Sequence, residues 1–378
     1  MFEKTKAFCD SFLELGLPGF DLAVYQDGEC ILRHRNGYRD LENKIPMDGT
    51  ERYNIYSCSK VITCVCALQL LERGLFSLED KLSKYLPEFE NMTVVGENGT
   101  ESAKKDILIR HLFEMTAGFS YNCSSPQLKR AVEETDGRCP TRETMKYLAE
   151  EPLLFEPGER WEYSLCHDVL AALVEVLSGE KFEDYVKKNI FDVVGMTHST
   201  FMLPEEELDT LAKQYRFENG HPVDVGKGIV TYKLGREYAS GGAGCISTVD
   251  DYILFLEALR TYRLLKPETI ARMTTDNLTQ QQKENYWVKF YGYGLGVRCP
   301  ITDTGLSDFG WGGAAGAYLA VDIKNKISLY FGSHLLSSPV QGLRSLIYRF
   351  VHAELLNPSE LDELSELLKK LHNYHLTY

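Results

Sequence analysis

The 378-residue sequence lacks the features that mark several large classes of protein. It contains no apolar run approaching the roughly 18 residues that a membrane-spanning helix requires. Acidic residues interrupt its first twenty positions early, and no apolar core of a secretory signal follows the first lysines. We therefore expect a protein without a membrane span that resides in the cytoplasm.

Paired cysteine motifs are also missing. The ten cysteines are scattered and include neither C-x-x-C nor a zinc-type spacing. Free thiols in a reducing compartment fit this distribution better than a disulfide framework does. Because no cluster of His, Cys, Asp or Glu has ligand spacing, we predict no metal ion and no cofactor.

Positive charge is scarce relative to negative charge. The chain has 41 Lys and Arg against 55 Asp and Glu, which gives a formal net charge of −14. Such an acidic protein repels phosphate backbones, and we find no basic stripe. We therefore expect neither nucleic acid nor an anionic membrane as a partner, and the sequence leaves the oligomeric state open.

Common catalytic signatures are absent as well. There is no G-x-S-x-G, no H-E-x-x-H, no P-loop and no G-x-G-x-x-G followed by an acidic residue. These absences argue against a nucleophile elbow, a zinc protease and a nucleotide-binding enzyme.

Strand patterns lie at both ends of the chain. Residues 1–16 predict a helix, and the following apolar runs flank Asp27-Gly28, a strong two-residue hairpin signal. From about residue 285 aromatic and β-branched runs return, as in YGYGLGVRC, AYLAVDI and KISLYFGS. Between the ends, helical segments alternate with long polar loops.

This order predicts an α+β fold. We expect one antiparallel sheet built from both chain ends and flanked by helices, with a mostly α-helical insertion. The predicted domains are a discontinuous α/β domain, 1–74 with 285–378, and a mainly helical domain, 75–284. The active site is expected in the cleft between them.

Ser57 and Lys60 begin a mostly apolar helix that the sequence predicts over 57–73. Residues at i and i+3 share a helix face, so the Lys60 amine should lie near the Ser57 hydroxyl. A serine hydroxyl is a weak nucleophile until a base takes its proton, and burial at a helix N-terminus disfavours the charged form of an amine. The alternative is an N-capping serine with a snorkelling lysine.

Two other S-x-x-K copies are weaker candidates. Ser102 and Lys105 lie in a polar loop, where both side chains should be solvated. Ser178 and Lys181 span Gly179, which is typical of a helix C-cap.

Two further segments could complete an active site. Tyr163 precedes an amphipathic helix after a Pro-Gly turn, so its phenol could point into a cleft and take part in proton transfer. Alternatively, the ring packs and its hydroxyl bonds to backbone. The glycines of FGWGGAAGAYLAVD could aim an N–H at an oxyanion, together with the N–H of Ser57, or could form a β-bulge or turn.

The order of these elements resembles the serine β-lactamase-like superfamily, which includes class C β-lactamases and DD-peptidases, and is most similar to family VIII carboxylesterases. The resemblance covers about residues 15–355. It rests on the segments PGFDLAVYQDGE, YSCSKVITCVCALQLLERGLFSLEDKLSKYLPEF, ILIRHLFEMTAGFSY, PGERWEYSLCHDVLAALVEVLSG, SGGAGCISTVDDYILFLEAL, YGYGLGVR and WGGAAGAYLAVD.

The resemblance implies a role for individual positions. Ser57 matches the acylated serine, Lys60 the lysine of the same helix, and Tyr163 the tyrosine of the second motif; we assign proton transfer to Lys60 and Tyr163 jointly. Trp311-Gly312-Gly313 match the strand motif that is usually Lys-Thr-Gly and would contact substrate. The backbone N–H of Ala314 would join that of Ser57 in the oxyanion hole.

Two departures from the family pattern bear on the substrate. The usual Tyr-x-Asn reads Tyr163-Ser164-Leu165, and Trp311 replaces the usual lysine. Leu165 and Trp311 remove an amide and a cation that would meet a β-lactam, and an unpaired buried carboxylate is costly. The resemblance therefore implies a small-molecule ester or amide substrate as the partner, and it favours a carboxylesterase for small uncharged esters. The alternatives are a β-lactamase or D-amino-acid peptidase, and a non-catalytic penicillin-binding-like sensor.

Three histidines are secondary candidates. We expect His167 on the surface of its helix rather than in the cleft, and His111 in a structural position. His334 follows the strand ISLYFGS and could lie at the edge of the site.

Overall fold

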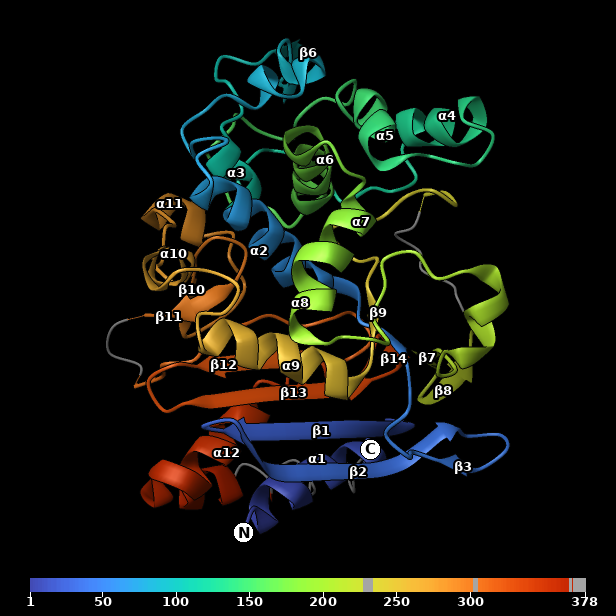
Figure 1. The fold of residues 1–378 in the computed structure, drawn as a ribbon, viewed down its shortest axis with the longest axis vertical. Coiled ribbons are helices and arrows are strands. Elements are labelled where there is room, and N and C mark those ends of the chain that lie inside the picture. Colours follow the sequence, from blue (N-terminus) through green and yellow to red (C-terminus); the bar gives the residue numbers. More distant parts are fainter. Residues whose placement is uncertain (227–233, 302–304, 367–368, 370–378) are drawn as a thin grey trace.

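The computed structural model describes residues 1–226, 234–301, 305–366 and 369, and it confirms the predicted α+β fold (Figure 1). Its central sheet has five strands in the order β12-β13-β1-β2-β3, and each neighbouring pair is antiparallel. The strands are β1 (Gly19–Gln26), β2 (Glu29–Asp40), β3 (Ile45–Pro46), β12 (Tyr318–Asp322) and β13 (Ile327–Ser333).

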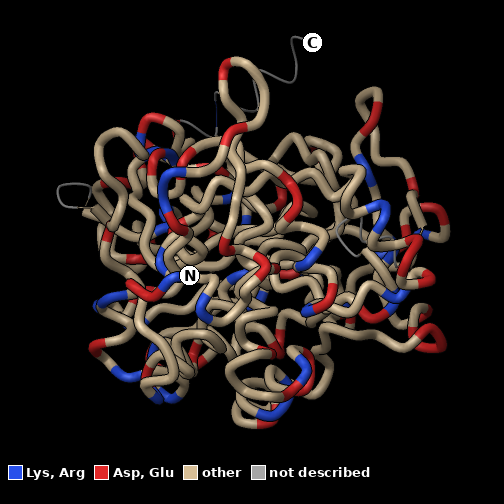
Figure 2. Tube along the Cα trace, turned by 90° about the horizontal axis from the view of Figure 1, so that it is seen from above, with Lys and Arg blue, Asp and Glu red and all other residues tan. Residues whose placement is uncertain are grey.

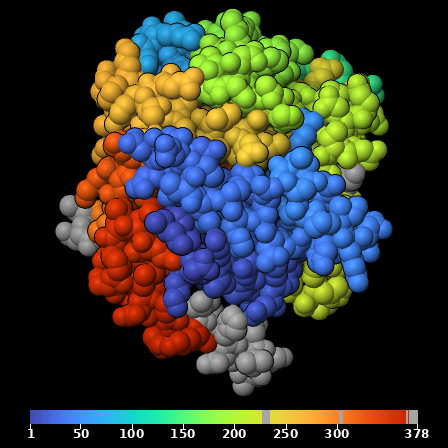
Figure 3. All heavy atoms as spheres, turned by 60° about the horizontal axis from the view of Figure 1, so that its bottom comes forward, coloured from blue at the N-terminus to red at the C-terminus, as the bar shows by residue number. Residues whose placement is uncertain are grey.

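The two ends of the chain meet inside this sheet, as predicted. β1 and β2 are joined by Asp27 and Gly28, whose φ angles of 52° and 90° suit the two central positions of a tight hairpin turn. β1 then pairs with β13, from Phe20 opposite Ser333 to Gln26 opposite Ile327. The first and last parts of the chain consequently lie side by side on one face of the molecule (Figure 3).

Helices cover both faces of the sheet (Figure 1). On one face lie α1 (Glu3–Glu14) and α12 (Leu346–Leu356), with the rings of Phe8 and Phe350 stacked at 4.5 Å. On the other face α9 (Val249–Arg260) stacks Tyr252 on Tyr330 of β13 at 4.3 Å. Because side chains alternate along a strand, Phe331, the next residue of β13, faces α1 and contacts Phe12.

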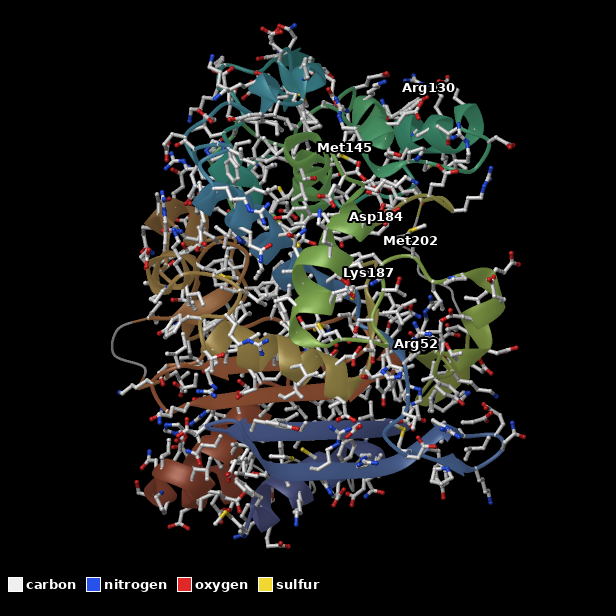
Figure 4. All side chains as sticks on the ribbon, in the orientation of Figure 1. Arg52, Arg130, Met145, Asp184, Lys187 and Met202 are labelled. Carbon is white, nitrogen blue, oxygen red and sulfur yellow. The ribbon has the colours of Figure 1, made fainter. Side chains whose placement is uncertain are left out.

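Beyond α9 lies a mostly helical region built around α2 (Ser59–Glu72) and α6 (Cys166–Ser178). Both helices are apolar on most faces because neighbours surround them. Met145 of α5 points toward α6 and is 1% exposed (Figure 4). The surrounding helices are α3 (Ile109–Phe113), α4 (Pro126–Glu134), α5 (Thr141–Leu148), α7 (Phe182–Val186) and α8 (Asp192–Val194).

The remaining elements are short. α10 (Pro267–Met273) and α11 (Gln280–Lys283) precede the strand pair β10 (Tyr291–Tyr293) and β11 (Arg298–Pro300). The other strands are β4 (Tyr53–Asn54) with β9 (Ile246–Ser247), β5 (Thr93–Gly96) with β6 (Gly99–Ser102), and β7 (Tyr215–Glu218) with β8 (His221–Asp224) and β14 (Leu335–Leu336). α9 belongs by sequence to the predicted helical domain 75–284, yet it packs on the sheet; the division into two domains stays a prediction.

Lys and Arg residues are interspersed among Asp and Glu residues along the backbone trace (Figure 2). Within the described ranges, no helix combines the length and the apolarity needed to cross a lipid bilayer.

His334, directly after β13, lies inside the protein rather than at an open edge. It is 2% exposed, and its Nδ1–H donates to the carbonyl of Lys213 at 2.6 Å. Burial lowers the pKa of His334 from 6.5 to about 4. The unfolded chain therefore binds a proton near pH 6.5 that the folded protein accepts only near pH 4.

We predict that the His334→Gln variant, which keeps a donor but cannot titrate, loses less stability in acid than the wild type. As pH falls from neutral to about 4, the wild type should lose up to roughly 3 kcal/mol of unfolding free energy relative to the variant. Urea unfolding across this pH range measures the difference. His221→Gln, at an exposed position of β8, is the control, and its stability should vary with pH as that of the wild type does. If the stabilities of His334→Gln and the wild type fell in parallel with pH, the prediction would be contradicted.

Candidate active site

Ser57 lies in a short 3-10 turn, η1 (Tyr56–Cys58), that leads into α2. Tyr56 before it has a φ of 47°, a left-handed conformation that is unfavourable for a bulky residue. The buried Tyr56 ring and the bond from its hydroxyl to Gln214 at 3.3 Å hold this turn in place. Ser57 is 8% exposed, so its hydroxyl lies in a largely closed site.

Lys60, in the first turn of α2, is completely buried and has three hydrogen-bond acceptors. Its Nζ donates to the Gly242 carbonyl at 2.7 Å, to the Tyr121 hydroxyl at 3.1 Å and to Ser57 Oγ at 3.3 Å. An ammonium group has three donors, so these three contacts satisfy the buried charge. The structure thus joins Ser57 and Lys60 directly.

The Gly242 carbonyl belongs to a loop, residues 240–244, that is packed tightly between α2 and α6. A Cβ on Gly242 would lie 2.5 Å from Asp168 Oδ2 and 3.3 Å from Lys60 Nζ. Asp168 is itself buried, and its Oδ1 accepts hydrogen bonds from Ser240 at 2.7 Å and Tyr238 at 3.0 Å. Burial raises the pKa of Asp168, while these bonds and the nearby charge of Lys60 oppose that rise.

Tyr163 lies on the other side of Lys60. Lys60 Nζ sits 4.5 Å from the centre of the Tyr163 ring, a cation–π contact. The Tyr163 ring stacks with Tyr121 at 5.3 Å and with Trp311 at 5.8 Å, and the Trp311 indole N–H donates to the Tyr163 hydroxyl at 3.2 Å. Among the described residues, no direct hydrogen bond joins the Tyr163 hydroxyl to Ser57 or Lys60.

The glycines after Trp311 lie against the segment that carries the serine. A Cβ on Gly313 would lie 2.3 Å from the carbonyl oxygen of Ile55, two residues before Ser57. The N–H of Ala314, the next residue, donates to no other residue that the structure describes. Its role in the oxyanion hole stays a prediction that this placement supports.

Arg344 provides a cation beside the same strand. Its Nη1 donates to the Gly313 carbonyl, and a Cβ on Gly312 would meet its Nη2 at 2.5 Å. Burial lowers the pKa of the Arg344 guanidinium. In the described part of the chain, no Asp or Glu forms an ion pair with it.

The remaining candidates are placed as follows. Leu165 is the N-cap residue before α6 and is 2% exposed within the hydrophobic core, so its contact with substrate stays a prediction. His167 is not on the helix surface as expected: it is fully buried with its Nε2 3.5 Å from Cys64 Sγ, because α6 is surrounded on that side too. His111 is buried and accepts a hydrogen bond from the Leu108 N–H at 3.1 Å. The described residues hold no group of three or more His, Cys, Asp or Glu suited to a metal ion.

Two partners of Lys60 were not identified from the sequence. Tyr121 and Gly242 lie in FSY and SGGAG, two segments that carry the family resemblance, but no motif assigns either residue a role. Only the fold shows that both face one amine.

The protein belongs to the beta-lactamase family, whose model matches residues 5–350. Protein Rv1367c of Mycobacterium tuberculosis (strain ATCC 25618 / H37Rv) is 28% identical over 359 residues, covering 86% of this chain and 87% of that protein. Esterase EstB of Burkholderia gladioli is 30% identical over 284 residues, covering 70% and 71% of the two chains. The solved structure of EstCE1, a hydrolase with promiscuous acyltransferase activity, has a TM-score of 0.77 at 24% identity and covers 92% of this chain and 97% of its own.

We predict that Gly242→Ala lowers stability, because a methyl group has no room between Asp168 and Lys60. Overpacking of this kind costs roughly 1–3 kcal/mol, which urea unfolding would resolve. Gly342→Ala is the matched control, since its Cβ would meet no atom within 4 Å. Equal stability of the two variants would show that the loop can accommodate a methyl group at Gly242.

Proposed function

We propose that this protein is a carboxylesterase that cleaves small uncharged esters through an acyl-enzyme on Ser57. The observation that carries the proposal is the buried Lys60 amine, hydrogen-bonded to Ser57 Oγ at 3.3 Å. A lysine held in this way has no contact with bulk water and is free to exchange a proton with the hydroxyl beside it. The similarity to Esterase EstB supports the same reaction class.

In the proposed reaction, Ser57 Oγ attacks the ester carbonyl carbon and loses its proton to the Lys60–Tyr163 pair. The 3.3 Å contact between Lys60 Nζ and Ser57 Oγ connects the serine directly to this pair. The N–H groups of Ser57 and Ala314 would stabilise the oxyanion. The C–O bond then breaks, the alcohol leaves with the proton, and a water molecule hydrolyses the acyl-enzyme by the reverse path.

Trp311 gives the site a preference for uncharged substrates. Where relatives that recognise β-lactams offer a lysine, this chain places an indole that is 6% exposed and hydrogen-bonded to Tyr163. One observation favours the second candidate, β-lactam hydrolysis: Arg344 supplies a cation beside Gly312 and Gly313 without a carboxylate partner in the described part of the chain. A third possibility, a non-catalytic binding protein, would leave Ser57 unreactive.

We predict that Ser57→Ala abolishes hydrolysis of p-nitrophenyl acetate and butyrate, because it removes the nucleophile. Ser102→Ala is the matched control, since Ser102 opens another S-x-x-K but lies exposed at the end of β6. A fluorophosphonate probe should label wild-type Ser57 only. Faster turnover of nitrocefin than of esters would favour the β-lactamase, and absence of labelling would favour the binding protein.

We predict that Tyr163→Phe lowers kcat by about 10²–10⁴-fold, the usual contribution of general acid–base catalysis. The phenylalanine ring keeps the stacking against Tyr121 and Trp311, so the loss reports on the hydroxyl. Tyr147→Phe, which removes a hydroxyl from the surface of α5, should leave kcat unchanged. An unaltered kcat for Tyr163→Phe would assign proton transfer to Lys60 alone.

A further inference from the structure

An exposed tryptophan continues the aromatic wall of the candidate active site. Trp287 lies between α11 and β10 and is 57% exposed, whereas Trp161 and Trp311 are 1% and 6% exposed. Single exposed apolar side chains are common, but this ring contacts two aromatic side chains of the candidate site, Trp161 and Tyr163.

The Trp287 ring is held in place by the cluster beneath it. It meets Trp161 edge to face, with ring centres 4.6 Å apart at 81°, and meets Tyr163 at 5.3 Å and 74°. Tyr163 in turn lies 4.5 Å from the Lys60 amine that contacts Ser57. A group attached to a substrate carbonyl at Ser57 would therefore extend along Tyr163 toward Trp287.

Three polar atoms of this wall are hydrogen-bonded within the protein or buried. The Trp311 indole N–H is used by the Tyr163 hydroxyl, and the Tyr286 hydroxyl donates to the Gly292 carbonyl at 3.1 Å. The Trp161 indole nitrogen is buried. The exposed ring of Trp287 offers a flat aromatic face, which suits a planar ring better than a charged group.

We propose that Trp287 forms a specificity subsite for an aryl group of the ester substrate. This inference rests on the proposed esterase function and narrows its substrate class. The aryl group could belong to the alcohol or to the acyl part of the ester, since either can reach the wall from the carbonyl at Ser57.

The experiment compares matched esters on wild type and Trp287→Ala. Benzyl acetate and cyclohexylmethyl acetate test the alcohol side, ethyl phenylacetate and ethyl cyclohexylacetate test the acyl side, and ethyl acetate has neither ring. Trp287→Ala should raise KM about tenfold for one of the two aryl esters, either the alcohol-side or the acyl-side one. A tenfold change is the size expected when one aromatic contact and the area that it buries are lost. The KM for ethyl acetate should stay unchanged in Trp287→Ala. Trp287→Phe should restore most of the affinity for the aryl ester.

Phe290→Ala is the control variant, because Phe290 is 69% exposed three residues further along. Equal losses on aryl, cyclohexyl and ethyl esters would overturn the proposal and show that Trp287 only supports Tyr163. Equal losses on aryl and cyclohexyl esters would overturn the assignment to an aryl group.

A binding experiment separates this inference from the esterase proposal. Saturation-transfer NMR measures binding of benzyl acetate and ethyl phenylacetate to two variants, Ser57→Ala and Ser57→Ala/Trp287→Ala. Weaker binding of one aryl ester by the double variant supports the subsite even if the wild type turns over no ester. Equal binding of both esters by the two variants overturns the subsite even if the wild type is an active esterase.

Discussion

The buried charge of Lys60 is the constraint on which the site depends. An ammonium group removed from water is costly unless every donor finds an acceptor. Lys60 meets this requirement with groups from three parts of the chain: its own helix turn, the loop after α3, and the loop before β9. Any arrangement that moved one of them would leave a buried donor unpaired, so the hydrogen bonds of one amine fix the relative positions of three segments.

Aromatic rings line one side of this amine. Tyr121, Tyr163 and Trp311 stack in series, and the indole N–H of Trp311 orients the Tyr163 hydroxyl. The Tyr121 and Tyr163 rings lie beside the buried Lys60 amine, and exclusion of water strengthens its electrostatic contacts. Trp311 therefore helps to position the phenol of Tyr163.

The parts of the fold set by local chemistry were predictable from the sequence. Asp27-Gly28 specified the hairpin through backbone conformations that its residues tolerate, and the spacing of Ser57 and Lys60 placed both on one face of a helix turn. Tyr121 and Gly242 could not be assigned in this way, because they lie 61 and 182 residues from Lys60 along the chain. His167 was misplaced for a related reason: its helix is covered by neighbours that helical periodicity does not reveal.

The pairing of β1 with β13 also governs when the protein can fold. β1 begins at residue 19, and its neighbour on the β12 side is not synthesised until residue 327. Until then the β1–β2 hairpin has one unpaired edge, which is a site for wrong association with other chains. The central sheet can therefore close only after nearly the whole chain has left the ribosome, and contacts this distant in sequence are slow to form.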